Sequence, residues 1–508
     1  MPLHPLLAAA YPVVFLFATN AAEQVTLDPL WAPLAWSVGA AAAVLVVMGL
    51  LTRNWRGAGL VTTVLVIGFF GYGHAWNAVG GMIDNQRMFA LGWLGLVGIA
   101  LYVVTGLRGS AVTATRALNV VAAVLLAVNA WSLATAMVAF GAREPTAADL
   151  SPIDLAPPDA DELPDVYNII VDRYAGPTAL AETYGFDNEP FLAALEERGF
   201  SVARHAHANY IKTPLSVVSS LNMEYLDPEP LKAEAKNGAD RAPIQRQLSD
   251  HLVVPTALKE IGYSYVHIGN WWAPTQDNVD ADRTFVYEGQ DEFTSVLGQT
   301  TILRALSADP APDDPWDWPS MRANNLYALD RLEEIPALPG PKFVFAHLVT
   351  THPPYVHNPD GSMTGREQVE RLGDLESYVL QLQYANTRLL GIIDRILASD
   401  PDAVIWLQAD EGPFPLRYDA DDWTFKWREA TDEELEQKFG ILFAMRVPGA
   451  DLEAAGFHDG ITAVNGFRVI FNARFGTDLE LLPDRVYAHE DLTRFYDFVD
   501  ITDRLDRG

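Results

Sequence analysis

The sequence predicts two architectures in one chain. An N-terminal bundle of about five transmembrane helices is followed by an α/β domain, whose mainly parallel central sheet is covered by helices on both faces. Up to residue 140, apolar runs recur with lengths close to the roughly 20 residues that a membrane helix needs. After residue 165, short apolar runs alternate with helical patterns. With 508 residues, the chain is also too long for one compact core.

Charge in the short loops predicts the orientation of the membrane helices. The apolar runs cover residues 3–20, 31–52, 59–78, 88–107 and 117–140. Arg53 and Arg56 follow the second run, and Arg108 and Arg116 follow the fourth. Basic loops stay in the cytoplasm. We therefore expect a multi-pass protein with a cytoplasmic N-terminus, in which everything after about residue 141 lies outside the cytoplasmic membrane.

The charge of the two parts is very different. Before residue 141 there are five Lys/Arg and three Asp/Glu, which leaves 30 basic and 63 acidic residues for the rest of the chain. So acidic a water-exposed part argues against nucleic acid as a partner, because phosphate backbones attract positive charge. The chain has no cysteine, so disulfides, thiolate catalysis and Cys-ligated zinc are excluded.

Residues 141–164 are rich in Pro, Ala and Asp and carry no apolar period, which predicts an extended linker between a membrane domain at 1–140 and a soluble domain at 165–508.

The strands expected in the soluble domain are 166–171, 263–268, 343–349, 403–408 and 441–445. The expected helices include 189–198, 254–261, 324–334, 374–398 and 464–475. In sheets of this kind, ligands bind beyond the carboxyl ends of the strands.

The stretch from Asn209 to Ser216 predicts the start of a helix that carries a candidate nucleophile. Thr213 precedes Pro214, and these residue types favour the N-cap and the first helical position. A hydroxyl there is a candidate nucleophile when a metal or a base also reaches it. The alternative for Thr213 is an ordinary Thr-Pro helix cap. Lys212 is a candidate for binding an anion, and the alternative is a solvated lysine.

Carboxylates follow two of the expected strands. Asp172 comes directly after 166–171, and Asp410 and Glu411 come directly after 403–409. The tips of parallel strands can bring such groups to one point, where Thr213 would complete a four-oxygen site. Oxygen ligands predict one divalent cation, Mn²⁺ or Mg²⁺ rather than Ca²⁺ or Zn²⁺. Taken singly, each acid also fits a solvated loop residue.

Two histidines belong to the same region. His347 lies within the expected strand 343–349, and His352 begins the turn that runs to Tyr355. Either imidazole is a candidate for protonating a leaving oxygen. The alternatives are a core histidine at position 347 and a satisfied loop histidine at position 352.

Several motifs together resemble the sulfatase-like branch of the alkaline phosphatase superfamily. They are DVYNIIVDRYAG, ANYIKTPLSVVSSLNMEYL, FVFAHLVTTHPPYVHNPDG, QYANTRLLGIIDRIL, WLQADEGP and ITAVNGFRVIFNARFGTDLELLPDR, and they cover most of residues 165–500. The layout resembles membrane-anchored bacterial members such as lipoteichoic acid synthase and lipid A phosphoethanolamine transferase. The closest similarity is to uncharacterised sulfatase-like membrane proteins.

The resemblance implies roles for particular residues. Asp172 falls at the first metal ligand, Thr213 at the nucleophile and Asp410 at the aspartate of an Asp-His pair. His352 falls in the turn that lines the substrate site; on the same grounds Asn209, Lys212 and Tyr355 are expected to bind substrate. The chain departs from the family at Glu411, where the pattern is Asp-His-Gly. No Cys/Ser-x-Pro-x-Arg run surrounds Thr213, so phosphoryl chemistry is expected rather than sulfate ester hydrolysis.

The resemblance therefore implies a metal-dependent phosphodiesterase or phosphotransferase in the bacterial inner membrane. Its catalytic domain would be periplasmic or extracellular, and its substrate a phospholipid head group or an envelope glycan. The alternative is a catalytically degenerate domain that serves as a binding or scaffold module in an envelope complex, with Glu411 marking a lost metal.

Overall fold

The computed structural model describes residues 1–20, 27–79, 85–106, 111–141, 153–156, 163–289, 292–306, 318–418 and 423–505. The chain forms two compact units, Met1–Glu144 with Gln290–Asp317, and Pro145–Gly289 with Trp318–Gly508. Gln290–Asp317 thus belongs to unit 1, although it falls within the range expected for the soluble domain. Most of the expected linker 141–164 lies outside the described residues.

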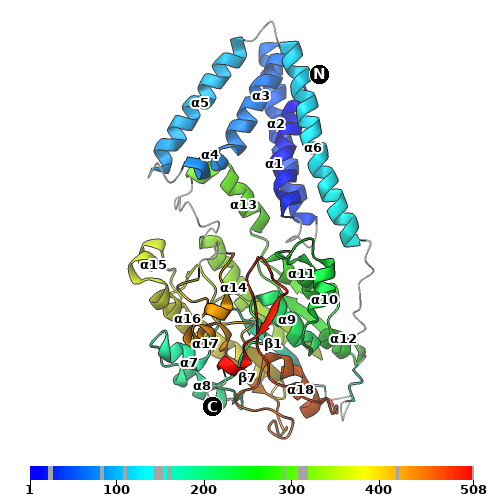
Figure 1. The fold of residues 1–508 in the computed structure, drawn as a ribbon, viewed down its shortest axis with the longest axis vertical. Helices are drawn as coiled ribbons and strands as arrows, with labels where there is room; N and C mark the ends of the chain where they lie inside the picture. Colours follow the sequence, from blue (N-terminus) through cyan, green and yellow to red (C-terminus); the bar gives the residue numbers. More distant parts are fainter. Residues whose placement is uncertain are drawn as a thin grey trace. The chain divides into compact units, whose positions relative to one another are not determined.

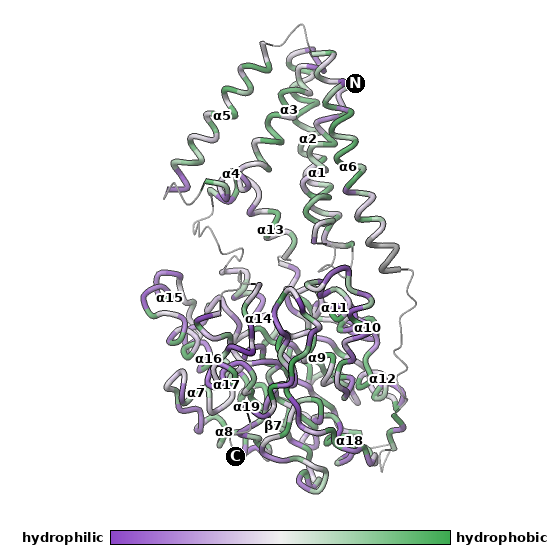
Figure 2. Tube along the Cα trace, in the orientation of Figure 1, coloured by the Kyte–Doolittle hydropathy of each residue, from purple (hydrophilic) through white to green (hydrophobic). Residues whose placement is uncertain are grey.

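Unit 1 is built from apolar helices, which appear largely green in the hydropathy colouring of Figure 2. They are α1 (His4–Thr19), α2 (Asp28–Thr52), α3 (Trp55–Phe70), α4 (Tyr72–Val79), α5 (Gln86–Gly106) and α6 (Ala111–Gly141). Three of them, at Pro29–Thr52, Gln86–Gly106 and Ala111–Thr135, are long and apolar enough to cross a membrane. The pair α3 and α4, bent by 46°, makes a fourth if it counts as one span, and α1 is shorter. The expectation of about five spans is not confirmed.

A segment from later in the chain packs into unit 1. Helix α13 (Glu292–Thr300) and the short 3-10 helix η3 (Ile302–Leu306) follow residue 290. Phe293 of α13 makes an edge-to-face contact with Phe17 of α1, with ring centroids 5.2 Å apart. Buried Arg304 donates to the side-chain oxygen of Asn77 at 2.8 Å. Apolar packing and a charge-assisted hydrogen bond therefore join this segment to the N-terminal helices.

Unit 2 contains a seven-stranded sheet in the order β2-β7-β6-β1-β5-β3-β4. Figure 1 labels two of its strands, β1 and β7. The strands are β1 (Val166–Val171), β2 (Ser201–Val202), β3 (Ser264–Ile268), β4 (Arg283–Phe285), β5 (Lys342–Leu348), β6 (Val404–Gln408) and β7 (Phe443–Arg446). The pairs among β6, β1, β5, β3 and β4 are parallel, and β7 is antiparallel to β6 and β2. A separate hairpin-like pair joins β8 (Tyr487–His489) and β9 (Phe498–Asp500). The expected mainly parallel sheet is confirmed.

The central strands are buried on both faces. Every residue of β1, β5 and β6 is buried, which is the pattern of a parallel sheet covered by helices. The helices of unit 2 are α7 (Pro177–Glu182), α8 (Glu189–Glu196), α9 (Thr213–Asn222), α10 (Pro228–Glu234), α11 (Ala242–Ser249), α12 (Val253–Glu260), α14 (Trp318–Glu334), α15 (Arg366–Leu372), α16 (Asp374–Ser399), α17 (Asp432–Phe439), α18 (Gly466–Arg474) and α19 (Thr502–Leu505). β1 and its neighbours β5 and β6 therefore form the centre of the core, and their carboxyl ends place the candidate site.

Candidate functional site

Strand register brings three ionisable side chains to one face of the sheet. Ile170 of β1 is level with His347 of β5 and with Gln408 of β6. Because side chains alternate along a strand, Asp172 follows on the same face as Ile170, and Asp410 follows Gln408 in the same way. The two acids thus lie just beyond the ends of β1 and β6. His347 lies within β5, level with Ile170, two residues before Asp172.

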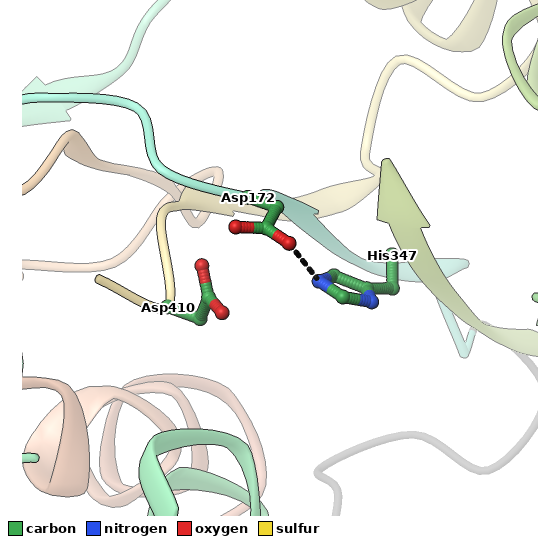
Figure 3. A group of neighbouring side chains, drawn as sticks. All are labelled: Asp172, His347 and Asp410. Atoms are coloured by element: carbon green, nitrogen blue, oxygen red, sulfur yellow. Dashed lines mark ion pairs between the residues drawn. The ribbon is translucent and has the colours of Figure 1, made fainter. Parts of the chain in front are cut away.

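These three residues form a group that could hold a metal ion. One ligand atom from each of Asp172, His347 and Asp410 lies within 4.8 Å of the other two, and Figure 3 shows the three side chains pointing toward one another. Asp172 Oδ2 is 3.7 Å from His347 Nε2. Asp172 Oδ1, His347 Nε2 and Asp410 Oδ2 are all buried without a hydrogen-bond partner among the described residues. Buried polar atoms are normally satisfied, so one such atom on each of three neighbouring residues fits a cation site.

The electrostatics of the group favour a bound cation. Burial raises the pKa of Asp172 well above its usual range, and the charge of Asp410 raises it further. Burial and the charge of Glu411 likewise raise the pKa of Asp410. Burial lowers the pKa of His347 to about 3, so its imidazole is neutral and able to bind a metal. A divalent cation among these groups would relieve the repulsion between the two carboxylates.

The second nitrogen of His347 is held by neighbouring side chains. Nδ1 lies 2.8 Å from the amide nitrogen of Asn270 and 3.2 Å from the hydroxyl of Thr275. Both neighbours are buried. Partners on the far side of a ligating imidazole orient its ring, as second-shell groups do in metal sites. The free Nε2 therefore stays directed at the Asp172 carboxylate.

Thr213 begins α9 beside this group. The expectation placed it at the N-cap, but Lys212 is the N-cap and Thr213 is the first helical residue. The shift by one position arises because the carbonyl of Lys212 already accepts from the N–H groups of Leu215 and Ser216, at 3.0 and 3.3 Å. The Thr213 hydroxyl lies close enough to Asp410 to lower the pKa of that carboxyl as a hydrogen-bond donor. The structure thus brings Thr213 to the acid at the end of β6.

Glu411 points to different partners from those of Asp410. Its Oε2 lies 2.8 Å from the ammonium nitrogen of Lys438 and accepts from the backbone N–H of Lys212 at 2.5 Å. Burial raises the pKa of Glu411, but Lys438, Lys212 and Arg173 outweigh burial and lower it overall. Glu411 is therefore a buried carboxylate that is ion-paired to Lys438. The group of possible metal ligands consists of Asp172, His347 and Asp410. A metal-binding role for Glu411 stays a prediction.

Three cations surround the ring of Phe414. The charged groups of Lys438, Lys212 and Arg173 lie 3.3, 4.2 and 4.8 Å from its centroid. Burial lowers the pKa of Lys438 to about 8, although Glu411 opposes the shift. A cluster of cations beside a candidate nucleophile is suited to binding an anionic group.

His352 lies in the turn after β5, and its ring is oriented by the backbone. Nδ1 contacts the carbonyl oxygen of Pro353, so this nitrogen carries the proton and donates it. Burial lowers the pKa of His352 well below its usual range, which keeps the ring neutral. In that tautomer Nε2 is an acceptor, which suits a proton-accepting role better than a proton-donating one.

The residues expected to bind substrate fall in different places. Tyr355 lines a cavity of about 170 Å³ together with Arg173, Tyr184, Tyr378, Phe414 and Tyr418. Asn209 is buried, and its amide donates to the carbonyl of Arg485 at 2.8 Å and accepts from the N–H of Val464 at 2.7 Å. Backbone partners occupy that amide, so substrate binding by Asn209 stays a prediction. Tyr355 has a cavity beside it into which a substrate group can fit.

Sequence reasoning missed Arg173 and Lys438. Arg173 directly follows Asp172 in the motif, and its side chain lies 3.8 Å from both Asp172 and Glu411. That adjacency was a usable signal. Lys438 lies on α17, 27 positions after Glu411 in the chain, and no local pattern connects the two. Only the folded structure shows that they form a pair.

Comparison with solved structures finds neighbours of the kinds that the motifs resemble. The C-terminal periplasmic domain of EcEptC from Escherichia coli, in complex with zinc, is 14% identical over 70% of this chain and 98% of that chain, with a TM-score of 0.45. Lipoteichoic acid synthase LtaP from Listeria monocytogenes is 12% identical over 68% and 83%, with a TM-score of 0.40. The soluble domain of lipooligosaccharide phosphoethanolamine transferase A from Neisseria meningitidis is 11% identical over 62% and 88%, with a TM-score of 0.37. No family model and no curated protein matches the chain.

Proposed function

We propose that the chain is a membrane-anchored, metal-dependent enzyme that transfers or hydrolyses a phosphoryl group of a phosphodiester. Thr213 is the nucleophile. One observation carries the proposal: the buried residues Asp172, His347 and Asp410 bring ligand atoms within 4.8 Å of one another, and the Thr213 hydroxyl lies beside Asp410. The motif resemblance adds the substrate class, a phospholipid head group or an envelope glycan.

Asp172, His347 and Asp410 would hold the cation. A bound divalent ion supplies positive charge that lowers the pKa of a nearby hydroxyl and offsets the charge of a phosphoryl group. An imidazole in the donor set suits Mn²⁺ or Zn²⁺ better than Mg²⁺ or Ca²⁺. The proposed ligand set therefore contains one nitrogen, whereas the ligand set expected from the sequence contained only oxygens.

The residues of the chain account for the remaining chemistry. Oγ1 of Thr213 attacks phosphorus, the bond from phosphorus to the leaving alcohol oxygen breaks, and a phosphothreonine ester forms. The Asp410 carboxylate, toward which the Thr213 hydroxyl donates, accepts the proton of that hydroxyl, and the leaving oxygen takes a proton from water. In the second half, water or an acceptor hydroxyl gives its proton to His352 Nε2 and attacks phosphorus. The bond from phosphorus to Oγ1 of Thr213 breaks, and Asp410 returns its proton to Oγ1, which restores the threonine. His352 then releases its proton to the solvent.

The cation cluster and the aromatic cavity supply positioning. Arg173 and Lys212 flank Phe414, and Arg173 also lines the cavity with Tyr355. The Arg173 charge stabilises the phosphoryl oxygens as negative charge builds on them, and Lys212, whose pKa burial lowers well below its usual range, offers hydrogen bonds to the same oxygens. The tyrosine-lined cavity receives the group esterified to phosphorus. A volume of about 170 Å³ limits this group to a small head group or part of one sugar ring.

The test replaces Thr213 by residues that differ only in the hydroxyl. Full-length chain in detergent, supplied with Mn²⁺ or Zn²⁺, is offered phosphatidylethanolamine and phosphatidylglycerol separately. Thr213→Val keeps the branched shape and removes the hydroxyl, so kcat/KM should fall by about 10³-fold or more, while Thr213→Ser should retain activity. Mass spectrometry of the wild-type peptide should show a phosphoryl adduct at position 213. Equal turnover by Thr213→Val would exclude Thr213 as the nucleophile.

One observation also supports a second candidate, a non-catalytic binding module. Glu411 stands where the family pattern has a histidine, and it is paired with Lys438. In this candidate the cation cluster around Phe414 binds an anionic envelope ligand without turning it over. Metal content separates the two candidates, because the module requires no bound ion when millimolar Mn²⁺ or Zn²⁺ is supplied and the enzyme requires about one per chain.

A further inference from the structure

Unit 1 contains a cavity of about 450 Å³ that the proposed chemistry does not use. Three helices form its walls, and each contributes one stripe of residues. On α1 the stripe begins at His4 and continues through Ala8, Tyr11 and Phe15, at spacings of four, three and four. Positions 63, 66, 67 and 70 of α3 and positions 118, 121, 122 and 125 of α6 are spaced three, one and three, so that members of each set lie three or four residues apart. Spacings of three and four mark one face of a helix, so one face of each helix lines this cavity, which we call the channel.

The shape of the channel limits what can fill it. From His4 to Leu16 the wall of α1 spans twelve residues, or about 18 Å at the helical rise. A volume of about 450 Å³ over that length describes a narrow, elongated space along α1. Such a space has room for a single linear chain.

The lining decides the chemistry of the occupant. Apart from His4, Thr63, His74 and Thr300, the lining consists of apolar and aromatic side chains and glycine. His4 Nδ1 is 2.6 Å from the hydroxyl of Thr63, so the polar group of one wall is bonded to that of another. Water requires two to four polar partners and finds few here, and an empty channel would leave its walls without contacts. A hydrocarbon chain meets both conditions.

Both ends of the channel are polar. His4 and Thr63 mark one end, where Asn119 of α6 accepts from the backbone N–H of His4 at 2.8 Å. At the other end are His74 of α4 and Thr300, the last residue of α13. A methyl group added at Gly73 would lie 2.2 Å from the carbonyl oxygen of Gln299, so α4 and α13 approach too closely there for any side chain. The segment from α13 thus helps to form the channel.

We propose that this channel binds one acyl chain of a phospholipid. Helix α6 and the bent pair α3–α4 meet the length and apolarity criteria for membrane helices, and the bulk hydrocarbon around such helices is phospholipid tail. The inference depends on unit 1 lying in the membrane. It does not depend on the chemistry proposed for Thr213, because the channel is built from other residues.

The test uses photolabelling of the full chain in phosphatidylcholine nanodiscs. A trace phospholipid carries a diazirine midway along one acyl chain, and a free fatty acid with the same group is used in a parallel arm. Labelled peptides should map to the channel faces of α1, α3 and α6. Labelling from random lipid contacts only, on the outer faces of these helices, would overturn the proposal, and so would labelling by the fatty acid alone.

Two neighbouring alanines provide a matched pair of variants. Ala122 lines the channel, and Ala123 is exposed on the same helix. Ala122→Phe places a ring in the channel, so labelling of the channel faces should fall by about tenfold, whereas Ala123→Phe should leave it unchanged. Ala8→Leu adds volume to the channel from α1 and should have the same effect as Ala122→Phe. Equal labelling of all variants contradicts the proposal. Thr213→Val should label like wild type, which separates this result from a failure of the proposed enzyme function.

Discussion

The backbone N–H of Lys212 donates to Oε2 of Glu411 at 2.5 Å, directly before the candidate nucleophile. Lys212 has a φ of 74°, a conformation that residues other than glycine adopt at a cost. The hydrogen bond to Glu411 therefore stabilises the strained conformation of Lys212, which is the N-cap residue of α9. The same oxygen is paired with Lys438, so one carboxylate connects α17 to Thr213.

Removing the Glu411 carboxylate should expose this dependence. Glu411→Ala leaves Lys438 buried without its carboxylate and the Lys212 N–H without an acceptor, so unfolding should cost about 3–5 kcal/mol less. Glu411→Gln keeps an acceptor for Lys212 and should lose less stability. Thermal unfolding of the detergent-solubilised chain measures both. Identical stabilities of Glu411→Ala and wild type would show that the pair has no structural role.

The metal site should depend on His347 and not on Glu411. His347→Gln removes the imidazole ligand, so Zn²⁺ or Mn²⁺ affinity should fall by at least about tenfold to a hundredfold. Glu411→Gln should retain about one ion per chain. Titration calorimetry with the metal alone gives both affinities. Loss of binding in Glu411→Gln with retention in His347→Gln would reverse the assignment of ligands.

A second buried ion pair offers a test of the core. Lys342 at the start of β5 is 1% exposed, and its ammonium contacts the carboxylate of buried Asp165. Lys342→Met leaves Asp165 charged and unpaired and should lower stability by about 3–5 kcal/mol. The double variant Lys342→Met with Asp165→Leu removes both charges and should recover most of the loss. A double variant less stable than Lys342→Met would contradict this explanation.

The stability of unit 2 should fall in mild acid because of His357. Its ring is fully buried, stacks on Tyr384 with centroids 4.3 Å apart, and has no hydrogen-bond partner among the described residues on either nitrogen. Burial lowers the pKa of His357 to about 3, and Arg322 and Arg388 contribute. The unfolded chain binds this proton near pH 6.5 and the folded chain does not, so stability is full above 6.5 and is lost as the pH falls toward 3, by about 1.4 kcal/mol per unit.

His357→Phe keeps a ring to stack on Tyr384 and removes the titration. The melting temperatures of wild type and His357→Phe, measured between pH 7 and pH 4 in one buffer series, should therefore differ increasingly as the pH falls, with the wild type losing more. Curves that stay parallel across this range would show that His357 is not the group responsible.

Much of the fold was predictable because its strands are buried on both faces. β1 was predicted with its observed bounds, and β3, β5 and β6 within one residue, since continuous apolar runs between helices identify such strands. Asp172, Asp410 and Thr213 were singled out from strand and helix ends, and the structure places them close together, while their roles stay a prediction. The membrane part was less certain, because α1 is short and α3 breaks into α4 at Gly71.

The ligand set was harder to predict than the fold. Which residues lie beside the two aspartates depends on the face of the sheet that each residue occupies. The register of β1 with β5 places His347 near Asp172, and Glu411 is paired with Lys438, which is distant in the sequence. Neither fact is local in the sequence. The sequence therefore pointed to the carboxyl ends of β1 and β6, but not to the pairing of Glu411 with Lys438 or to the position of His347 beside Asp172.

Anomalous diffraction from crystals of the full chain grown with Mn²⁺ or Zn²⁺ tests the central claim most directly. One peak should lie about 2.0–2.2 Å from ligand atoms of Asp172, His347 and Asp410, with the Thr213 oxygen beside it. A peak coordinated by Glu411 in place of His347, or no peak at this cluster with millimolar metal, would contradict the account.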